Sequence, residues 1–315
     1  MNNKKMEPLG GTELQYQFLK KYVAKDILDH FEICLSVPGR TPLAANKINI
    51  LWQKMAPDQP HFQEFFKDKE KINQYDLYVF NSHWNYEQFR KTFSLPHEKC
   101  TVIKNGFSNL KLRDTEQKKD KIKLIYHPTP WRGLSILLGA MQLIQSDNIE
   151  LDVYSSTKVY GTDFEKENDD QYKELYDQAK KLPNVNYIGY KSNEYILDNL
   201  HKYDAFVYPN IWEETFCISA LEALACGLYV ATTDNGALYE TCSEFPAYVP
   251  YDPNYENLAA QFAAVIDDIP NMINSPKVQY HLKFQQKFYD QFYNWKNIGK
   301  QWTNFLKGAL NARPK

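Results

Sequence analysis

The sequence has few of the features that mark disulfide frameworks, metal sites or membrane spans. Its five cysteines are scattered, their number is odd and no CxxC pair occurs, so a reducing, cytoplasmic location is expected. The seven histidines show no HxxxH or HxH spacing. No stretch approaches the roughly 20 apolar residues of a membrane span. The N-terminus has no apolar run typical of a signal peptide.

Net charge is also small. A formal charge of −2 over 315 residues argues against a general nucleic-acid binder, and no such partner is expected. Aromatic residues make up 15% of the chain, mostly Tyr and Phe, and most such residues fill cores. The length is typical of about two domains.

What the sequence does contain is an alternation of short apolar runs with amphipathic helical patterns such as "GTELQYQFLKKYVAKD". This alternation is typical of βαβ units and buried parallel sheets. The runs predicted to form strands are residues 48–52, 77–82, 100–106, 123–127, 149–156, 185–190, 205–210 and 228–233.

The polar stretch "RDTEQKKDK" (113–121) contains no apolar residue and is predicted to be a linker. The fold class expected is α/β, with two doubly wound Rossmann-like domains facing a central cleft. The predicted limits are 1–115 for the first domain, 116–294 for the second domain, and 295–315 for a terminal helix.

The tail carries large apolar residues at helical spacing. Core packing of one long helix is the prediction, and a helix on a membrane surface is the alternative. The residues assigned to the buried face are Phe284, Phe288, Phe292, Trp295, Ile298, Trp302 and Phe305.

The stretch "EETFCISALEALACG" (213–227) is the densest signal in the chain. A strand ends before it, a loop carries Glu214, and a helix follows that Gly227 is expected to end. Ser219 with Glu222 matches a capping box, so Glu222 either caps the helix or binds a ligand. Glu214 has no such explanation, because it lies upstream of a helix N-terminus that favours an anion.

A nucleoside-diphosphate sugar accounts for this arrangement. Its diphosphate would rest on the N–H groups at the helix start. Glu214 would accept hydrogen bonds from the sugar hydroxyls, and Glu222 from the ribose hydroxyls.

The stretch resembles the E-x7-E motif of the GT4 group of retaining GT-B glycosyltransferases. That group usually has Glu-Gly-Phe-Gly where this chain has Glu214, Thr215, Phe216 and Cys217, so Thr and Cys replace both glycines. The resemblance implies that this run binds the donor and that Glu214 is catalytic.

Further motifs follow in the order of the family. "YHPTPWRGLSILLGAM" resembles the segment that binds the diphosphate, which implies that Arg132 is catalytic and donor-binding. The family's second basic residue falls at His127. "VNYIGYKS" resembles the loop that holds the nucleobase through backbone groups near Tyr190 and Lys191.

In the first domain, "LGGTE" resembles the glycine-rich loop of the family. The resemblance implies that Gly11 contacts the donor and that Gly10 lies on the acceptor side. It also implies that the first domain (1–115) is the acceptor-side domain with a shortened first strand, that the second (116–294) binds the nucleotide sugar, and that the terminal helix returns to the first domain. The family often has a histidine near the reacting sugar, and the candidate segment "NILWQKMAPDQP" offers Lys54 instead.

The predicted function is transfer of a sugar from a nucleoside-diphosphate sugar to a hydroxyl acceptor, with retention and without a metal or other cofactor. The expected acceptor is a glycan, a lipid-linked compound or a small molecule. Peripheral contact of the protein with a membrane is compatible with this function. "ENDDQY" (167–172) is the nearest match to a metal-binding Asp-x-Asp and is predicted to be a solvated face. The alternatives are a non-catalytic nucleotide-sugar-binding protein and a GT-B sugar-nucleotide epimerase.

Overall fold

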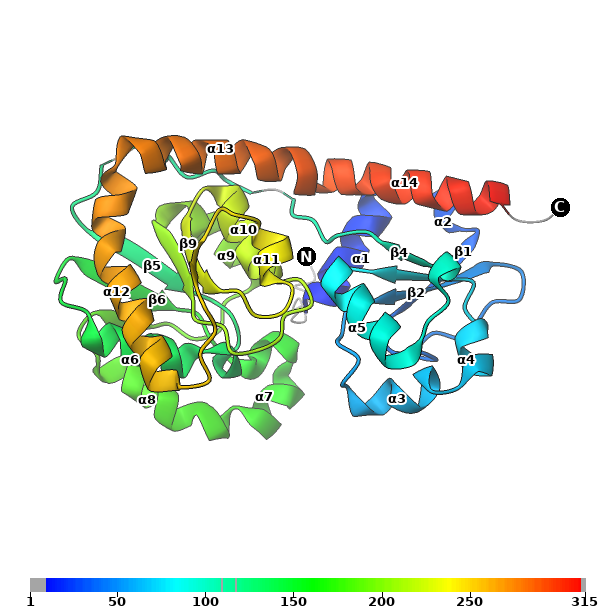
Figure 1. Ribbon diagram of the computed structural model, residues 1–315, viewed down its shortest axis with the longest axis horizontal. Coiled ribbons are helices and arrows are strands. Elements are labelled where there is room, and N and C mark those ends of the chain that lie inside the picture. The colour runs from blue at the N-terminus through cyan, green and yellow to red at the C-terminus, as the bar shows by residue number, and fades with distance from the viewer. Residues whose placement is uncertain (1–9, 109, 117, 313–315) are drawn as a thin grey trace, which may run out of the picture. The chain divides into compact units, whose positions relative to one another are not determined.

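A computed structural model describes residues 10–108, 110–116 and 118–312 of the chain, which divide into two compact units (Figure 1). The N-terminal unit comprises Gly11–Ser108, Glu214–Cys217 and the chain from Gln291 onward. The C-terminal unit comprises residues 110–213 and Ile218–Asp290, together with Gly10. The shortened first strand expected before Gly10 lies outside the described residues. The sequence-based domain limits stay predictions.

A four-stranded parallel sheet in the order β1-β2-β3-β4 forms the centre of the N-terminal unit. Its strand β2 is buried along its whole length, and the apolar cores on its two faces contain Trp52 and Leu51 respectively. The strands are β1 (Phe31–Leu35), β2 (Ile48–Gln53), β3 (Leu77–Phe80) and β4 (Cys100–Val102).

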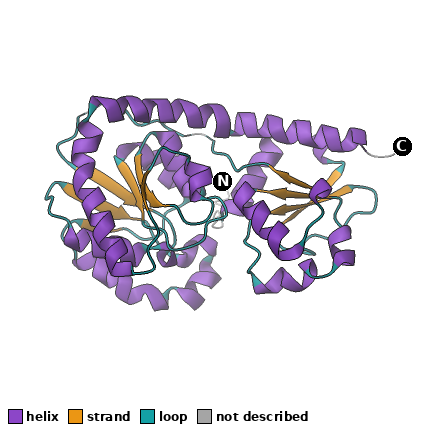
Figure 2. Cartoon of the chain, viewed as in Figure 1, coloured by secondary structure: helices purple, strands orange, loops and turns teal. Residues whose placement is uncertain are grey.

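Helices complete this unit, as the purple coils of Figure 2 show. The C-terminal helix α14 packs its buried face into the same core as α1, so the end of the chain returns to the N-terminal unit. The helices are α1 (Gly11–Tyr22), α2 (Lys25–Leu28), α3 (Pro60–Phe66), α4 (Lys69–Asn73), α5 (His83–Phe93), the short 3-10 helix η1 (His97–Lys99) and α14 (Trp295–Ala312).

The C-terminal unit contains a six-stranded parallel sheet in the order β10-β9-β8-β5-β6-β7. The strand order reverses between β5 and β8, and ligands of doubly wound sheets bind beside such a reversal. The strands are β5 (Ile122–Tyr126), β6 (Ile149–Val153), β7 (Val185–Tyr187), β8 (Ala205–Tyr208), β9 (Tyr229–Thr233) and β10 (Ala247–Val249).

The α-helices of this unit are α6 (Leu134–Leu143), α7 (Thr162–Asn168), α8 (Lys173–Lys181), α9 (Asn193–Asn199), α10 (Ile218–Cys226), α11 (Leu238–Cys242), α12 (Tyr255–Asn274) and α13 (Pro276–Tyr293), whose last turn enters the other unit. The 3-10 helices are η2 (Pro130–Arg132), η3 (Thr157–Tyr160), η4 (Asp170–Tyr172) and η5 (Leu200–Lys202).

Every run predicted as a strand contains one, and the structure adds β1 and β10. The sequence "FEICL" of β1 was missed because Glu32 interrupts its apolar run. Strand β10 has only three residues at the edge of its sheet, which is too short to show a period.

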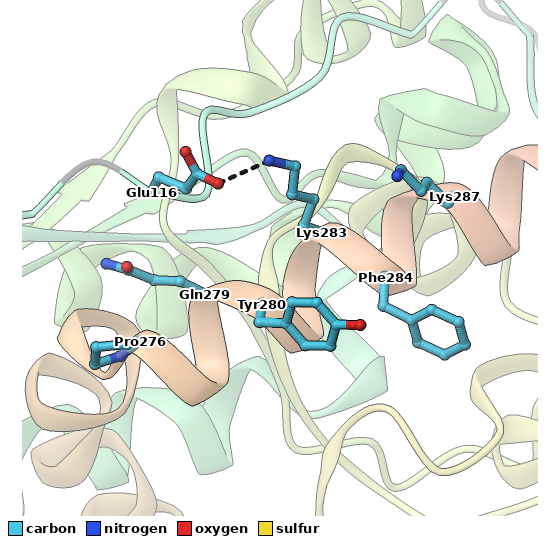
Figure 3. Close-up of a pocket in the computed structure, with 7 residues that line it drawn as sticks. All are labelled: Glu116, Pro276, Gln279, Tyr280, Lys283, Phe284 and Lys287. Carbon is cyan, nitrogen blue, oxygen red and sulfur yellow. Dashed lines mark hydrogen bonds and ion pairs between the residues drawn. The ribbon is translucent and has the colours of Figure 1, made fainter.

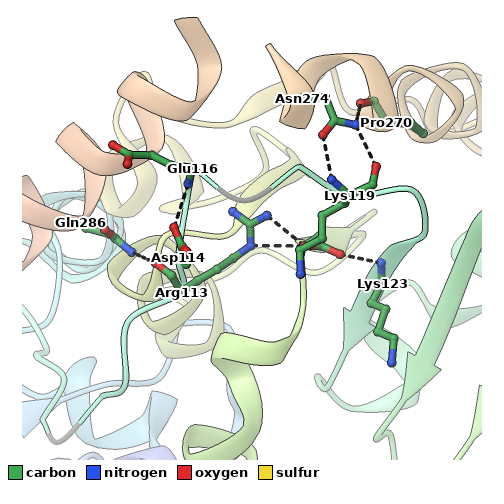
Figure 4. Close-up of polar contacts among 9 residues, drawn as sticks. Arg113, Asp114, Glu116, Lys119, Lys123, Pro270, Asn274 and Gln286 are labelled. Carbon is green, nitrogen blue, oxygen red and sulfur yellow. Dashed lines mark hydrogen bonds and ion pairs between the residues drawn. The ribbon is translucent and has the colours of Figure 1, made fainter. Parts of the chain in front are cut away.

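The prediction of a polar linker at 113–121 is wrong at its start, where Arg113 is buried (Figure 4). Its Nη2 donates to Asp204 Oδ1 at 2.9 Å, and its carbonyl accepts a bond from Gln286 Nε2 at 2.8 Å. The other oxygen of Asp204 accepts from the backbone N–H of Lys123 at 2.9 Å. The segment is therefore fastened to the sheet of the C-terminal unit.

The prediction of one long tail helix is also wrong. Asn294 separates α13 from α14, and its Oδ1 accepts a bond from the N–H of Lys296 in the new helix at 3.0 Å. The assigned apolar face holds in α14 but not in α13, where Phe284 and Phe292 are each 53% exposed. The buried face of α13 carries Leu282, Gln285, Gln286, Tyr289 and Tyr293.

Candidate active site

The turn that carries Arg132 lies against the end of β8. Arg132 closes η2, which follows β5, and Gly133 then adopts φ +109° before α6 begins. A Cβ atom at position 133 would lie 2.0 Å from the carbonyl oxygen of Pro209, directly after β8. Since no side chain fits there, glycine at 133 lets the Arg132 turn approach the neighbouring strand end.

The loop after β8 is held in a defined conformation. Asn210 is fully buried, its Oδ1 accepts from the N–H of Trp212 at 2.9 Å, and its carbonyl accepts from Thr233 Oγ1 at 2.8 Å. The Arg132 guanidinium carbon lies 5.9 Å from the centroid of the Trp212 ring. An arginine is always charged, so a permanent cation stands beside this loop.

His127 does not supply a second cation. Burial lowers the pKa of its imidazole to about 4, so the ring is neutral near pH 7. Its Nε2 is buried and, like the nearby Thr129 Oγ1, has no hydrogen-bond partner among the residues that the structure describes. These two groups can offer hydrogen bonds to a ligand, but only Arg132 offers charge.

Glu222 is buried inside α10 and 2% exposed. Helix α10 begins at Ile218, so Ser219 lies inside its first turn and the capping-box alternative is wrong. The Glu222 carboxyl instead accepts a hydrogen bond from the side chain of Asn193. Burial nevertheless raises the pKa of Glu222 to about 8.

The end of α10 follows the prediction made for Gly227. This glycine has φ +90°, its N–H bonds to the carbonyl of Leu224 at 3.1 Å, and the N–H of Leu228 bonds to that of Ala223 at 3.0 Å. This pair of bonds is the Schellman motif that ends helices at glycine.

The loop between β7 and α9 brings Tyr190 and Lys191 to the start of α9. Ser192 caps that helix by accepting the N–H of Tyr195 at 3.2 Å. The Lys158 ammonium lies 5.8 Å from the centroid of the Tyr190 ring. Asn193, the partner of Glu222, is the first residue of α9, so this loop and Glu222 are connected directly.

The run Glu214–Cys217 belongs to the N-terminal unit, although Glu213 and Ile218 belong to the other. Glu214 is 5% exposed, and Phe216 is buried with its ring centroid 6.4 Å from that of Tyr293. Cys217 has φ +70°, a left-handed conformation that favours glycine and is uncommon for other residues.

Lys54 is buried at the end of β2 in the same unit. Its Nζ donates to Asn105 Oδ1 at 2.5 Å and lies 3.7 Å from the centroid of the Trp52 ring. Burial holds its pKa well below the usual value, with the charge of Glu13 opposing this in part. Lys54 is therefore a buried amine held by an amide oxygen and an aromatic ring rather than a solvated side chain.

The glycine pair lies at the start of α1. Gly11 is the first residue of that helix and is exposed, and Gly10 precedes it. The helix is held to the loop after β4 by Gln15, whose Nε2 donates to the carbonyl of Gly106 at 2.8 Å. The same glutamine accepts from Trp295 Nε1 at 3.0 Å, which ties α14 to this loop.

The residues of "ENDDQY" are exposed or half-buried, as the prediction of a solvated face requires, and Asp169 also makes bonds within the unit. Asp169 Oδ1 accepts bonds from Thr157 N at 3.1 Å, from Thr157 Oγ1 at 2.8 Å and from Tyr176 OH at 2.9 Å. The aspartate therefore fastens η3 to α8 within the C-terminal unit.

Comparison with known protein families identifies the family of this chain. The family described as "Glycosyl transferases group 1" matches residues 111–276, which is just over half of the chain. The chain is a group 1 glycosyltransferase. It is also 23% identical over 242 residues to the lipopolysaccharide 1,2-N-acetylglucosaminetransferase of Salmonella typhimurium, across 70% of this chain. The chain matches 60% of the length of that relative.

Solved structures identify the fold of this glycosyltransferase as GT-B. A glycosyltransferase from Rickettsia africae has a TM-score of 0.68 at 14% identity, covering 99% of this chain and 85% of that one. HepE from Anabaena, in complex with UDP-glucose, has a TM-score of 0.63 at 17% identity, covering 85% of this chain and 73% of that one. The α/β prediction with two Rossmann-like domains is confirmed.

Within the glycosyltransferase, the structure brings some predicted residues together in each unit. The Arg132 turn meets Pro209 and Trp212, which follow β8, in the C-terminal unit, and Glu222 meets the loop of Tyr190 there. Asn193 was missed, although "KSNE" carries the Ser cap that places it on the first turn of a helix.

Proposed function

We propose that this group 1 glycosyltransferase moves a sugar from a nucleoside-diphosphate sugar to a hydroxyl acceptor with retention of the anomeric configuration and without a metal ion. The observation that supports this most is the fixed position of Arg132, whose turn packs on the Pro209 carbonyl so closely that Gly133 is required. A permanent cation is thereby held at the carboxyl ends of parallel strands, where such sheets bind ligands.

The leaving group would be stabilised by electrostatics. A nucleoside diphosphate departs with growing negative charge, and Arg132 together with the N–H groups of the first turn of α10 supplies a positive field for it. This set of groups needs no metal ion to do so.

The nucleoside would be bound by the C-terminal unit. Glu222 is the acceptor for the ribose hydroxyls, and Asn193 orients its carboxyl group. Backbone groups near Tyr190 and Lys191 hold the base, in a loop that the Ser192 cap keeps in place.

The sugar would be bound by the run Glu214–Cys217. Glu214 accepts hydrogen bonds from the sugar hydroxyls, and the backbone N–H groups of Thr215, Phe216 and Cys217 contribute to donor binding, as does Gly11. In the transfer step the anomeric C–O bond to phosphate breaks and the acceptor oxygen bonds on the same face. The hydroxyl proton passes to the departing phosphate.

The acceptor would bind near Lys54, in the N-terminal unit, and near Gly10, the residue before α1. The buried amine of Lys54 and the amide of Asn105 form a polar group suited to a hydroxylated molecule. The name of the Salmonella relative points to a glycan or lipid-linked glycan as acceptor class.

The test is a panel of nucleotide sugars, beginning with UDP-glucose, which HepE binds. A true donor raises the melting temperature, because binding to the native state stabilises it. Incubation with glycan acceptors should then release nucleoside diphosphate, and NMR should show a product with the anomeric configuration of the donor, with or without EDTA.

Three other outcomes of this test would each contradict a different part of the proposed function. Binding of the donor without release of nucleoside diphosphate would indicate a non-catalytic binding protein. Conversion of the donor sugar without acceptor would indicate an epimerase. Loss of transfer in EDTA would contradict metal independence.

Peripheral contact with an anionic membrane is proposed for the outer face of α13. Tyr280 is 76% exposed on this face, and it lines a shallow cavity of about 520 Å³ with Phe284 and two lysines, Lys283 and Lys287 (Figure 3). Exposed aromatic residues flanked by lysines are typical of interfacial helices. No described helix is long and apolar enough to cross a membrane. The cytoplasmic location remains a prediction.

A further inference from the structure

The side chain of Thr215 fastens the run Glu214–Cys217 to the N-terminal unit. Its Oγ1 donates to the carbonyl of Lys54 at 2.8 Å and accepts from Asn81 Nδ2 at 3.2 Å. The backbone carbonyl of Thr215 accepts a further bond from Ser82 Oγ at 2.6 Å. One residue thus makes three bonds to the ends of β2 and β3.

The groups that hold Thr215 are themselves held. Ser82 caps α5 by accepting the N–H of Asn85 at 3.0 Å, and Asn81 Oδ1 accepts from Asn85 Nδ2 at 3.1 Å. The N–H of Lys54 donates to Gln53 Oε1 at 2.8 Å. Asn81, Ser82 and Asn85 are all buried. Thr215 therefore binds to a rigid part of the unit rather than to mobile surface side chains.

We propose that Thr215 is a positioning residue, which holds Glu214 in place for the transfer reaction through its side-chain bonds to Lys54 and Asn81. This rests on the proposed function. Glu214 is the next residue in the chain, so loss of the attachment would displace its backbone and carboxylate. A glycine at this position would offer neither the donor nor the acceptor that Thr215 uses.

The substitutions that test this keep the backbone N–H assigned to the donor. Thr215→Val has nearly the same shape but removes both hydroxyl bonds, whereas Thr215→Ser keeps them. Thr92→Val is the matched control, because Thr92 is exposed and its hydroxyl donates to the Gln88 carbonyl within α5.

With UDP-glucose as probe, Thr215→Val should lower kcat by about 10- to 100-fold, the order expected when a reacting group is misplaced. Affinity for UDP, measured by calorimetry, should stay within about 2-fold, because Arg132 and Glu222 lie in the other unit. Thr215→Ser should recover most of kcat, and Thr92→Val should behave as wild type. A wild-type kcat in Thr215→Val, or no recovery in Thr215→Ser, overturns the proposal.

A second measurement does not depend on turnover. Amide hydrogen exchange in residues 214–217 should be faster in Thr215→Val than in wild type and unchanged in Thr92→Val. If the wild-type protein shows no turnover with any nucleotide sugar, the proposed function fails. In that case, unchanged amide exchange in Thr215→Val would also show that the Thr215 side chain does not hold residues 214–217 in place. Faster exchange would show that it does.

Discussion

Replacing Glu222 by Gln is expected to remove a pH-dependent loss of stability. Burial raises the pKa of this carboxyl group from its ordinary 4.5 to about 8. In the unfolded chain the group releases its proton near pH 4.5, whereas in the folded chain it keeps the proton up to about pH 8. Unfolding therefore releases a proton in this window, and the free energy of unfolding falls as pH rises through it.

The size of the effect follows from the two pKa values. They differ by about 3.5, and each pKa unit corresponds to 1.36 kcal/mol, so the full loss approaches about 5 kcal/mol above pH 8. The amide of the substituted side chain has no proton to release in this range and can still bond to Asn193. Glu222→Gln should therefore match wild type near pH 4.5 and be more stable than wild type by several kcal/mol at pH 8.

Urea unfolding followed by circular dichroism at a series of pH values between about 4.5 and 8.5 measures this. Glu167→Gln is the control, since it makes the same chemical change at an exposed position of α7. Parallel stability curves for wild type and Glu222→Gln across the series would show that Glu222 is ionised in the folded protein and refute the reasoning.

The remaining predictions concern ligands and packing. Arg132→Ala should weaken UDP binding by roughly 1.5–3 kcal/mol, the value of a charge-assisted hydrogen bond, and unchanged affinity in calorimetry would remove its role. Glu214→Gln should weaken UDP-glucose binding and lower turnover yet leave UDP bound as before; wild-type turnover would contradict its assignment. Gly133→Ala should destabilise the protein by about 3 kcal/mol in urea unfolding, because the new Cβ meets a carbonyl oxygen in a left-handed conformation, and near-wild-type stability would contradict the close approach. The double substitution of Tyr280 and Phe284 by Ser should leave the melting temperature unchanged and reduce sedimentation with phosphatidylserine vesicles, and equal sedimentation would exclude the α13 face.

Strand positions and the α/β class could be predicted because a fully buried strand has little choice of residue. Tail helix α13 shows where prediction from the sequence fails, because its buried face was assigned wrongly. Its Phe residues gave the apolar period, but the buried positions include Gln285 and Gln286. Gln285 donates to the carbonyls of Leu224 and Leu228, and Gln286 to those of Arg113 and Cys226. A buried amide that satisfies backbone carbonyls cannot be told from a surface amide by hydropathy.

Some parts of the candidate site could likewise be predicted from the sequence, and others could not. Arg132 could be proposed as a site residue because its segment resembles the one that binds the diphosphate in the family. The partners of Thr215 and Glu222 could not, because Asn81, Ser82 and Asn193 reach them from distant parts of the chain. Long-range hydrogen bonds leave no periodic trace in a sequence.

Glu214 and Glu222 have different surroundings in the structure. Glu214 belongs to the N-terminal unit with Thr215, while Glu222 belongs to the C-terminal unit with Asn193. A nucleoside-diphosphate sugar carries its ribose and its sugar on opposite sides of the diphosphate, and the proposed function assigns Glu222 to the ribose and Glu214 to the sugar. In the proposed function, the loss of one carboxylate should therefore impair the sugar end and the loss of the other the ribose end. A pair of carboxylates serving one helix cap would show no such difference.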